Sequence, residues 1–419
     1  MSACHDKLVT LAPATASTRR VRVLVGQAVV KFALFATYAG MVSVLLPAKV
    51  ALLDPHDKVA ALAAITSIAL GITAFAQPIV GALSDRTKSR FGRRIPWIAS
   101  AALLGGLAIG VVGSAQSLLL VGVVWIVGQP SFKALEVSTD AYLVDEFPPS
   151  RRGSAAGIVG LALVAGTATG AVLSASLETR SADATWILAG AVVLAAASFA
   201  VLVRDPRSER LDGQSRPFVD SVRAVTKTMA SHPDYIKVLL WQIGFSLAYG
   251  VVFAYLLYVV TDLIGIPKVT AAHLIGLATV LGGLAAAASV ALGGWLSDRL
   301  GRRRPFMLLG NGLVVVGDGI LFAAPTASSV LVTAVLFGIG LGLSISCGRA
   351  LASQVLPDQT TGAAAGLGLL NTATSLGQAA APLLGALVIG WGGYPATFVA
   401  SIVFAIACSV AIALVKTVR

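Results

Sequence analysis

The chain has 419 residues, of which 57% are hydrophobic and only 12% are charged. A soluble globule could not bury so many apolar side chains, so the composition excludes that class and indicates a protein whose solvent is lipid. The formal net charge of +12 would suit a nucleic-acid-binding protein, and the positions of the basic residues decide whether that class applies.

About twelve apolar segments, each long enough to cross a bilayer as a helix, follow one another along the chain. The alternation of apolar and polar residues that marks barrel strands is missing from runs such as 187–203. We therefore predict an all-α membrane protein. The expected spans are 23–47, 59–82, 96–114, 117–142, 155–177, 184–203, 236–261, 270–296, 305–324, 328–352, 363–390 and 394–415.

Most of the 31 Lys and Arg residues fall in segments that this topology places on one side of the membrane. The basic residues expected on the other side are Lys49, Lys58, Arg180 and Lys268. This asymmetry predicts a multi-pass protein of the cell inner membrane with both termini in the cytoplasm. Because topology accounts for the positive charge, we expect a lipid bilayer and a small-molecule solute as partners, and no nucleic acid.

A charged stretch, GALSDRTKSRFGRRIPW at residues 81–97, lies between the second and third spans. A shorter version, GGWLSDRLGRRRPF, recurs at residues 293–306 between the eighth and ninth spans. The repeat indicates two related halves with a charged loop at the same place in each. We predict a disordered tail over 1–20, six-helix bundles over 21–203 and 236–419, and a linker over 204–235 that holds an amphipathic helix on the membrane surface.

Both charged loops carry an Asp-Arg pair followed by a glycine and arginines. These residues are Asp85, Arg86, Gly92 and Arg93 in the first loop and Asp298, Arg299, Gly301 and Arg302 in the second. The pattern resembles the signature loop of the major facilitator superfamily. The longer first loop is similar to that of the glycoside, pentoside and hexuronide cation symporters and of the related sucrose transporters. The resemblance implies two pseudo-symmetric six-helix bundles around a midplane cavity that opens alternately to either side.

Charged side chains at helix ends can lock two bundles together and release them when the cavity changes sides. We therefore assign the residues of both loops to gating, with Asp145, which follows the fourth span, as a carboxylate partner of the arginines. The alternative is that the loops only carry the charge that orients the chain in the membrane.

The fourth predicted span carries three charged residues, Lys133, Glu136 and Asp140. Their spacing places them on one helical face, and that face cannot look at lipid. One interpretation is a self-neutralising contact between Lys133 and Glu136. The other is a cavity lining in which Glu136 and Asp140 couple transport to protons and Lys133 tunes the pKa of Glu136 or meets the solute. Asp140 lies nearer the cytoplasmic end and could instead pair with the arginine-rich loop.

Other polar and aromatic side chains inside the spans are candidates for solute binding. Lys31 in the first span is costly unless it faces a partner or water, although it could also snorkel to the interface. Arg349 could bind an anionic group or brace the second loop through Asp298. Asp262, which flanks an outer loop, is expected to be solvated. The solute-binding candidates are Lys31, Tyr38, Gln129, Lys133, Trp241, Gln242, Tyr249, Arg349, Asn371 and Gln378.

The sequence contains no nucleotide-binding loop, metal-ligand cluster or nucleophile beside a base, so we expect neither an enzyme nor a cofactor, and an ion gradient is the remaining energy source. The resemblance to cation symporters implies acidic residues for sodium in the second span, but this span has none, which favours protons. We predict a monomeric, proton-coupled secondary transporter of a small polar organic solute, with a sugar or glycoside favoured by the first loop. The alternatives are a proton-driven exporter of a drug-like metabolite, which the spacing of Gly157, Gly166 and Gly170 would suit, and a non-transporting sensor.

Overall fold

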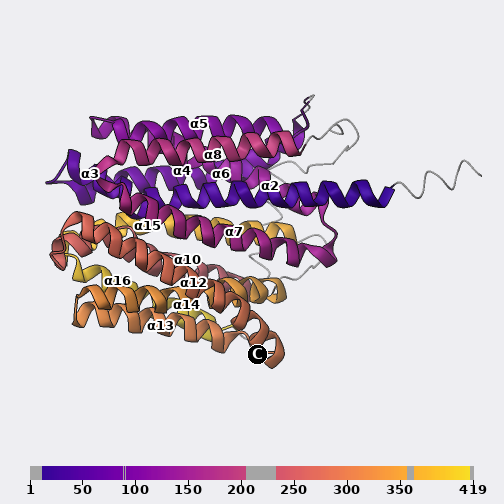
Figure 1. Ribbon diagram of the computed structural model, residues 1–419. Coiled ribbons are helices and arrows are strands. Elements are labelled where there is room, and N and C mark those ends of the chain that lie inside the picture. Colours follow the sequence, from indigo (N-terminus) through magenta and orange to yellow (C-terminus); the bar gives the residue numbers. More distant parts are fainter. Residues whose placement is uncertain (1–11, 88, 90, 204–232, 356–362, 416–419) are drawn as a thin grey trace, which may run out of the picture.

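The computed structural model describes residues 12–87, 89, 91–203, 233–355 and 363–415. Within these ranges the chain is helical and contains no strand. Twelve helices are long and apolar enough to cross a membrane, as the sequence predicted. They lie nearly parallel, with most of the first half, coloured indigo to magenta, above most of the second half, coloured orange to yellow (Figure 1). The predicted all-α membrane fold is therefore confirmed.

The first half begins with one long, interrupted helix. This helix consists of α2 (Ala12–Gly40), the π-helical turn η1 (Met41–Leu45) and α3 (Leu46–Leu53). The other helices of this half are α4 (Lys58–Arg86), α5 (Ile95–Ser114), α6 (Leu118–Glu146), α7 (Pro149–Ser176) and α8 (Ser181–Leu202), with the short 3-10 turn η2 (Glu178–Arg180) before α8.

The second half repeats this plan, again with a π-helical turn near the end of its first spanning helix. Its elements are α10 (Pro233–Phe253), α11 (Leu256–Tyr258), the π-helical turn η3 (Val259–Leu263), α12 (Lys268–Leu300), α13 (Arg304–Ala323), α14 (Ala327–Val355), α15 (Ala363–Gly392) and α16 (Pro395–Ala413).

Both charged loops turn at a glycine with a left-handed backbone. Gly92 has a φ of 95° and Gly301 a φ of 61°. Residues with a side chain rarely adopt this conformation, which explains why each loop needs glycine at that point. The next helix in each half starts with a proline in its first turn, Pro96 in α5 and Pro305 in α13, where the missing N–H breaks no helical hydrogen bond.

The N-terminal region differs from the sequence prediction. Residues 12–20 belong to α2, whereas we expected them in a disordered tail. Arg19 on this extension forms an ion pair with Glu146 at the end of α6, with 3.2 Å between Nε and Oε1, and this contact supports the added turns. Residues 1–11 and the amphipathic helix expected in the linker lie outside the described residues. The boundaries of the two bundles stay predictions.

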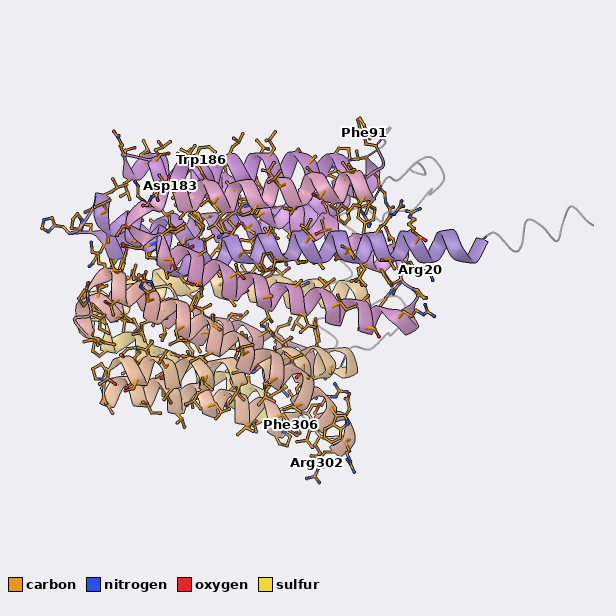
Figure 2. All side chains as sticks on the ribbon, viewed as in Figure 1. Arg20, Phe91, Asp183, Trp186, Arg302 and Phe306 are labelled. Carbon is orange, nitrogen blue, oxygen red and sulfur yellow. The ribbon has the colours of Figure 1, made fainter. Side chains whose placement is uncertain are left out.

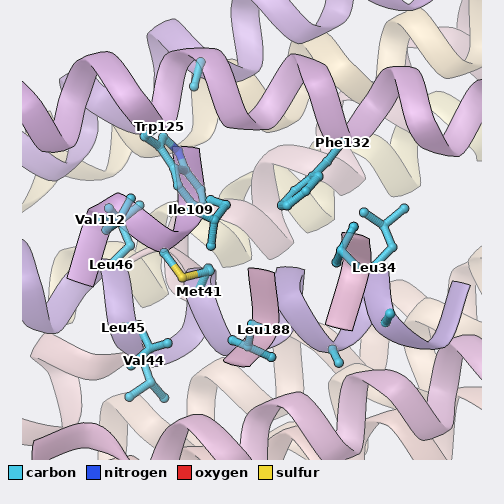
Figure 3. Close-up of a cluster of buried hydrophobic side chains, with 14 of the residues drawn as sticks. Leu34, Met41, Val44, Leu45, Leu46, Ile109, Val112, Trp125, Phe132 and Leu188 are labelled. Atoms are coloured by element: carbon cyan, nitrogen blue, oxygen red, sulfur yellow. The ribbon is translucent and has the colours of Figure 1, made fainter. Parts of the chain in front are cut away.

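We call the end of the molecule with Gly92 and Gly301 the arginine-rich end, and the other the opposite end. The halves meet where α4 packs against α15 and α7 against α12. One cluster of buried side chains, the shared core, includes Val44 and Leu46 of the first half and Val259 of the second. Figure 3 shows first-half members of the shared core on and around α2.

A second cluster, the local core, contains Trp241, Met307 and Leu351 and is confined to the arginine-rich end of the second half. The shared core, in contrast, contains side chains of both halves and includes residues beside the opposite end, such as Val259. Hydrophobic burial therefore joins the two halves near the opposite end, whereas at the arginine-rich end the buried side chains of the local core come from the second half only.

Gly166 and Gly170 allow α7 to approach α2 closely. A Cβ atom added at Gly170 would overlap the backbone carbonyl of Ala36, and one at Gly166 would overlap that of Phe32. Glycines spaced by four residues commonly serve such packing in membranes. The glycine spacing therefore has a structural explanation and does not by itself favour an exporter.

We expect Gly170→Leu to destabilise the protein by about 1–3 kcal/mol, because the backbones of α7 and α2 must move apart. Gly160→Leu on the same helix is the matched control, since a Cβ there meets no atom within 4 Å. Thermal unfolding of the purified variants, followed by tryptophan fluorescence, would reveal the difference. Equal melting temperatures for the two variants would contradict close packing at Gly170.

Candidate transport site

A cluster of charged and polar side chains joins α2 to α6; we call Gln27, Lys31, Lys133, Glu136 and Asp140 the charged cluster. Lys31 Nζ lies 3.3 Å from Glu136 Oε1 and 2.9 Å from the Asp140 carboxylate. Gln27 donates a hydrogen bond of 3.1 Å to Asp140. Lys133 Nζ lies 3.0 Å from the other oxygen of Glu136. Two lysines and two carboxylates thus neutralise one another between two membrane-spanning helices.

Helix geometry explains why these residues meet. Gln27 and Lys31 are one turn apart on α2, and the three charged residues of α6 share a face, as the sequence predicted. The predicted contact between Lys133 and Glu136 exists, but it is one side of a larger network. The Lys31 side chain is 5% exposed and points inward, so the snorkelling interpretation is wrong.

Asp140 is the more exposed of the two carboxylates in the charged cluster. Its side chain is half exposed, although protein atoms surround much of it. The Glu136 side chain is only 16% exposed. The predicted pairing of Asp140 with the arginine-rich loop is not found, because Lys31 and Gln27 occupy its carboxylate. Asp140 is therefore the carboxylate of this network that protein atoms cover least.

Aromatic rings border the charged cluster. Tyr38 packs edge-on against Phe132 and Phe35, with ring centroids 5.9 and 5.7 Å apart. Tyr38 is also close enough to Glu136 to feel its charge. Lys31 Nζ lies 5.7 Å from the centre of the Phe35 ring, within the range of a cation–π contact. The structure thus brings Tyr38 to the charged cluster.

Two further solute-binding candidates, one on α6 and one on α10, are buried. Gln129 is buried on α6. Trp241 is fully buried in the local core, stacked on Phe245 and packed against Gly348, so it cannot contact a solute in this conformation. Burying the large apolar ring among packed helices is more favourable than leaving it beside water. This burial is why Trp241 does not serve as the solute-binding residue that we predicted.

The remaining candidates in the second half are more accessible. Gln242 is partly buried within 3.5 Å of Ser246, and Tyr249 stacks on Phe253. Asn371 and Gln378 are exposed on α15. The side chain of Arg349 lies outside the described part of the structure. None of the contacts above connects these second-half residues with the charged cluster.

The first charged loop is tied to the end of α6. Arg93 Nη2 and Arg94 Nη1 each lie 2.6 Å from the same oxygen of Asp145, as expected of this carboxylate. The side chains of Asp85 and Arg86 are outside the described residues. These contacts join residues of one half, so they do not form the predicted lock between bundles in this conformation.

The second charged loop is also tied to its own half. Asp298 accepts a hydrogen bond of 2.9 Å from Arg303. The Arg299 guanidinium lies 5.5 Å from the centre of the Trp295 ring, and Arg302 is exposed. Asp298 is therefore engaged by its own loop. The alternative in which Arg349 braces Asp298 involves a side chain outside the described residues.

Polar contacts between the halves occur at the opposite end; we call Pro47, Lys58, Tyr258, Asp262 and Tyr394 the latch. Lys58 Nζ lies 2.5 Å from Asp262 and 4.9 Å from the Tyr258 ring centre. The Tyr258 hydroxyl donates to the Pro47 carbonyl oxygen at 2.9 Å, and that of Tyr394 donates to Asp262 at 2.6 Å. Burial, together with Asp262, raises the pKa of Tyr394, so its hydroxyl remains a donor. Asp262 is thus paired across the halves and not simply solvated.

Sequence reasoning also missed two buried polar residues of α13. Asn311 donates a hydrogen bond of 2.9 Å to Ser409 of α16. Asp318 is fully buried beside Ser401, and neither carboxylate oxygen has a hydrogen-bond partner of ordinary geometry. A single carboxylate in an otherwise apolar span was the available signal, because such a group is costly in a membrane. Among the described residues, no group of three or more His, Cys, Asp or Glu is arranged to hold a metal ion.

A family model described as Major Facilitator Superfamily matches residues 28–283 and 269–419. The chain belongs to the Major Facilitator Superfamily. It is therefore a transporter and not an enzyme, and the resemblance stated from the two charged loops is confirmed. This superfamily assignment also accounts for the paired halves and the helices that span the membrane.

Two curated relatives of this superfamily member match parts of it. It is 30% identical over 287 residues to the probable nitrate/nitrite antiporter NarK1 of Thermus thermophilus, an alignment of 59% of this chain and 60% of that protein. It is 31% identical over 114 residues to the probable inositol transporter 2 of Arabidopsis thaliana, covering 27% and 19%. The chain thus spans less than two thirds of each relative.

Solved structures of other transporters share the fold. A bacterial homologue of the human lysosomal transporter Spinster, inward-facing and unoccupied, superposes with a TM-score of 0.72 over 95% of this chain and 97% of that one. The nucleoside transporter NupG gives a TM-score of 0.71 over 93% and 97%. Both are 12% identical to this chain, so the likeness concerns the fold alone.

Proposed function

We propose that this member of the superfamily is a proton-coupled secondary transporter of a small polar organic solute. We propose further that the charged cluster couples movement of the proton to movement of the solute. The observation that supports the proposal most is the position of Lys31, which bonds Glu136 and Asp140 at once inside the helical bundle. Charged groups at this depth are costly and commonly belong to ion pathways.

The coupling follows from the charge balance of the cluster. With both carboxylates ionised, two lysines and two acids are formally neutral. A proton that enters at the half-exposed Asp140 and passes to Glu136 leaves Lys31 with one charged partner instead of two. An uncompensated cation in a bundle of low dielectric is unfavourable. Protonation therefore changes the free energy of binding a solute beside the cluster, and solute binding changes the free energy of protonation by the same amount.

A sugar or glycoside is the favoured solute. The first charged loop resembles that of sugar symporters, and a matched relative is named as an inositol transporter. Tyr38 beside the charged cluster supplies a ring and a hydroxyl, which suit a polyhydroxylated solute. Amides exposed on α15, Asn371 and Gln378, add hydrogen-bonding groups from the other half.

An inorganic anion is the second candidate. The relative that matches the longer part of the chain is named as a nitrate/nitrite antiporter. Lys31 and Lys133 would supply positive charge for such an anion if the carboxylates were protonated. This candidate predicts exchange of anions and no binding of uncharged sugars.

The arginine-rich end would face the cytoplasm, because the basic residues concentrate there and mark the inner side. Both termini would then be cytoplasmic, in a monomeric protein of the inner membrane. In that orientation the latch closes the outer end of the molecule.

Uptake of radiolabelled sucrose, myo-inositol and nitrate into proteoliposomes tests the function. We expect sucrose or myo-inositol to accumulate only when the outside is more acidic than the inside. Accumulation under the reverse gradient would favour an exporter, and nitrate exchange that ignores the gradient would favour the anion candidate. Binding of any of the three without flux would favour a sensor.

A further inference from the structure

Arg304, at the start of α13, is partly exposed, and two of its three guanidinium nitrogens lack an acceptor. Its Nε and Nη2 atoms are buried and have no hydrogen-bond partner. Burying a cationic group without an acceptor is unfavourable, so buried guanidinium groups are normally paired. The free N–H groups at the start of α13, where Arg303 makes no side-chain cap, favour an anion at the same place.

The first half shows what the second half lacks. Aligning Gly92 with Gly301 sets the Asp-Glu pair at 145–146 opposite Gln-Val at 354–355. In the first half this acidic pair binds arginines, including Arg94. The equivalent acids are absent from the second half. Arg303, which aligns with Arg94, is paired with Asp298 instead. Arg304 aligns with Ile95, so it is a cation that the first half does not have.

An apolar groove of about 370 Å³ lies between α13 and α16. It begins one helical turn after Arg304 along α13. Leu308, Gly312 and Val315 line it from α13, and Ile406 and Val410 from α16. Val410 is 53% exposed, and both helices belong to the membrane-spanning set. The groove therefore opens towards the hydrocarbon layer.

The arginine and the groove are on one face of α13. Arg304 precedes Leu308 by one turn and Gly312 by two, so about 6 Å and 12 Å along the helix separate them. Arg302 adds an exposed guanidinium group two residues away, at the outer corner of the arginine-rich end (Figure 2). The Arg304 side chain thus lies at the membrane-surface end of the apolar groove. At this depth the headgroup of a lipid joins its acyl chains.

We propose that an anionic phospholipid binds at this place. Its phosphate would accept hydrogen bonds from Arg304 and Arg302, and one acyl chain would lie in the groove along Leu308 and Gly312. A free phosphate would satisfy the arginines but would leave the groove without an occupant. A phospholipid satisfies both, which is why the lipid is the ligand that fits.

Purified full-length protein, delipidated in neutral detergent, can be titrated with dioleoyl phosphatidylglycerol, dioleoyl phosphatidylcholine or inorganic phosphate while thermal unfolding is followed. We expect phosphatidylglycerol to raise the melting temperature at concentrations where the other two have little effect. Arg304→Gln should weaken this response about fivefold in apparent affinity. Arg22→Gln, an exposed arginine on α2, is the control for general attraction and should leave the affinity unchanged.

The groove is tested separately from the charge. A Cβ at Gly312 meets no protein atom within 4 Å, so Gly312→Leu should fill the groove without strain and weaken phosphatidylglycerol binding. Gly319→Leu on the same helix, also with free space around its Cβ, should not. Equal responses to the two lipids, a phosphate response as large as the lipid response, or unchanged affinity in both Arg304→Gln and Gly312→Leu would overturn the lipid site.

Discussion

Glu136→Gln should abolish accumulation of the solute under a proton gradient while sparing exchange of solute across the membrane. The amide has nearly the same shape as the carboxylic acid but cannot release or take up a proton. It also leaves Lys133 without its carboxylate and Lys31 with Asp140 alone. The cluster would then be unable to change charge at its centre, which is the step that we assign to coupling.

The measurement is uptake into proteoliposomes with the gradient imposed, followed by counterflow without it. Glu146→Gln is the matched control, because it is the last residue of the same helix and pairs with Arg19 away from the charged cluster. Removing one partner from a buried ion pair can cost about 3–5 kcal/mol, so retained counterflow also shows that the variant is folded. Full accumulation by Glu136→Gln would remove this residue from the coupling role.

Lys58→Gln should shift the protein towards a state that is open at the opposite end. Lys58 connects α4 to Asp262 of the second half and lies over Tyr258, so its loss weakens contacts that hold the halves together there. A partly exposed ion pair of this kind contributes about 1 kcal/mol, which corresponds to a roughly fivefold change in the ratio of open to closed molecules. Distances between spin labels on the two halves, measured at that end, report the ratio directly.

Two comparisons separate the latch from general charge effects. Asp183→Asn breaks the ion pair of Arg180 and Asp183, which lies at the same end but within one half, and should leave the ratio unchanged. The charge exchange Lys58→Asp with Asp262→Lys should restore most of the closed population. An unchanged ratio of open to closed molecules in Lys58→Gln would mean that the hydrophobic contacts of the shared core alone keep this end closed.

The fold could be predicted closely because hydropathy and length decide the helices. A span needs a long apolar run, and the runs of this sequence correspond to the observed helices. The repeat of the charged loop indicated the two halves, and the positive φ of Gly92 and Gly301 now explains why glycine recurs there. The start of α2 was missed because Ala12 to Thr18 is not hydrophobic, yet a helix can extend beyond the membrane when an ion pair such as Arg19 to Glu146 supports it.

The candidate site could be predicted only in part. Helical spacing placed Lys133, Glu136 and Asp140 on one face, but it could not show that Lys31, about 105 residues earlier, binds two of them. Such pairing depends on the rotation of one helix against another, which local sequence does not specify. The same applies to Trp241, whose burial follows from its packing against Gly348 of a distant helix.

The two π-helical turns, η1 and η3, each lie near the end of the first spanning helix of their half, close to the latch residues Pro47 and Tyr258. A π turn accommodates one more residue than an α turn and bonds its backbone less regularly, so it bends at a lower energetic cost. The tips of two helices can thus tilt while their longer parts, including Lys31, stay packed. Opening of this end would then be a bend at the two π turns, which separates the helix tips. The contacts of the latch oppose that separation.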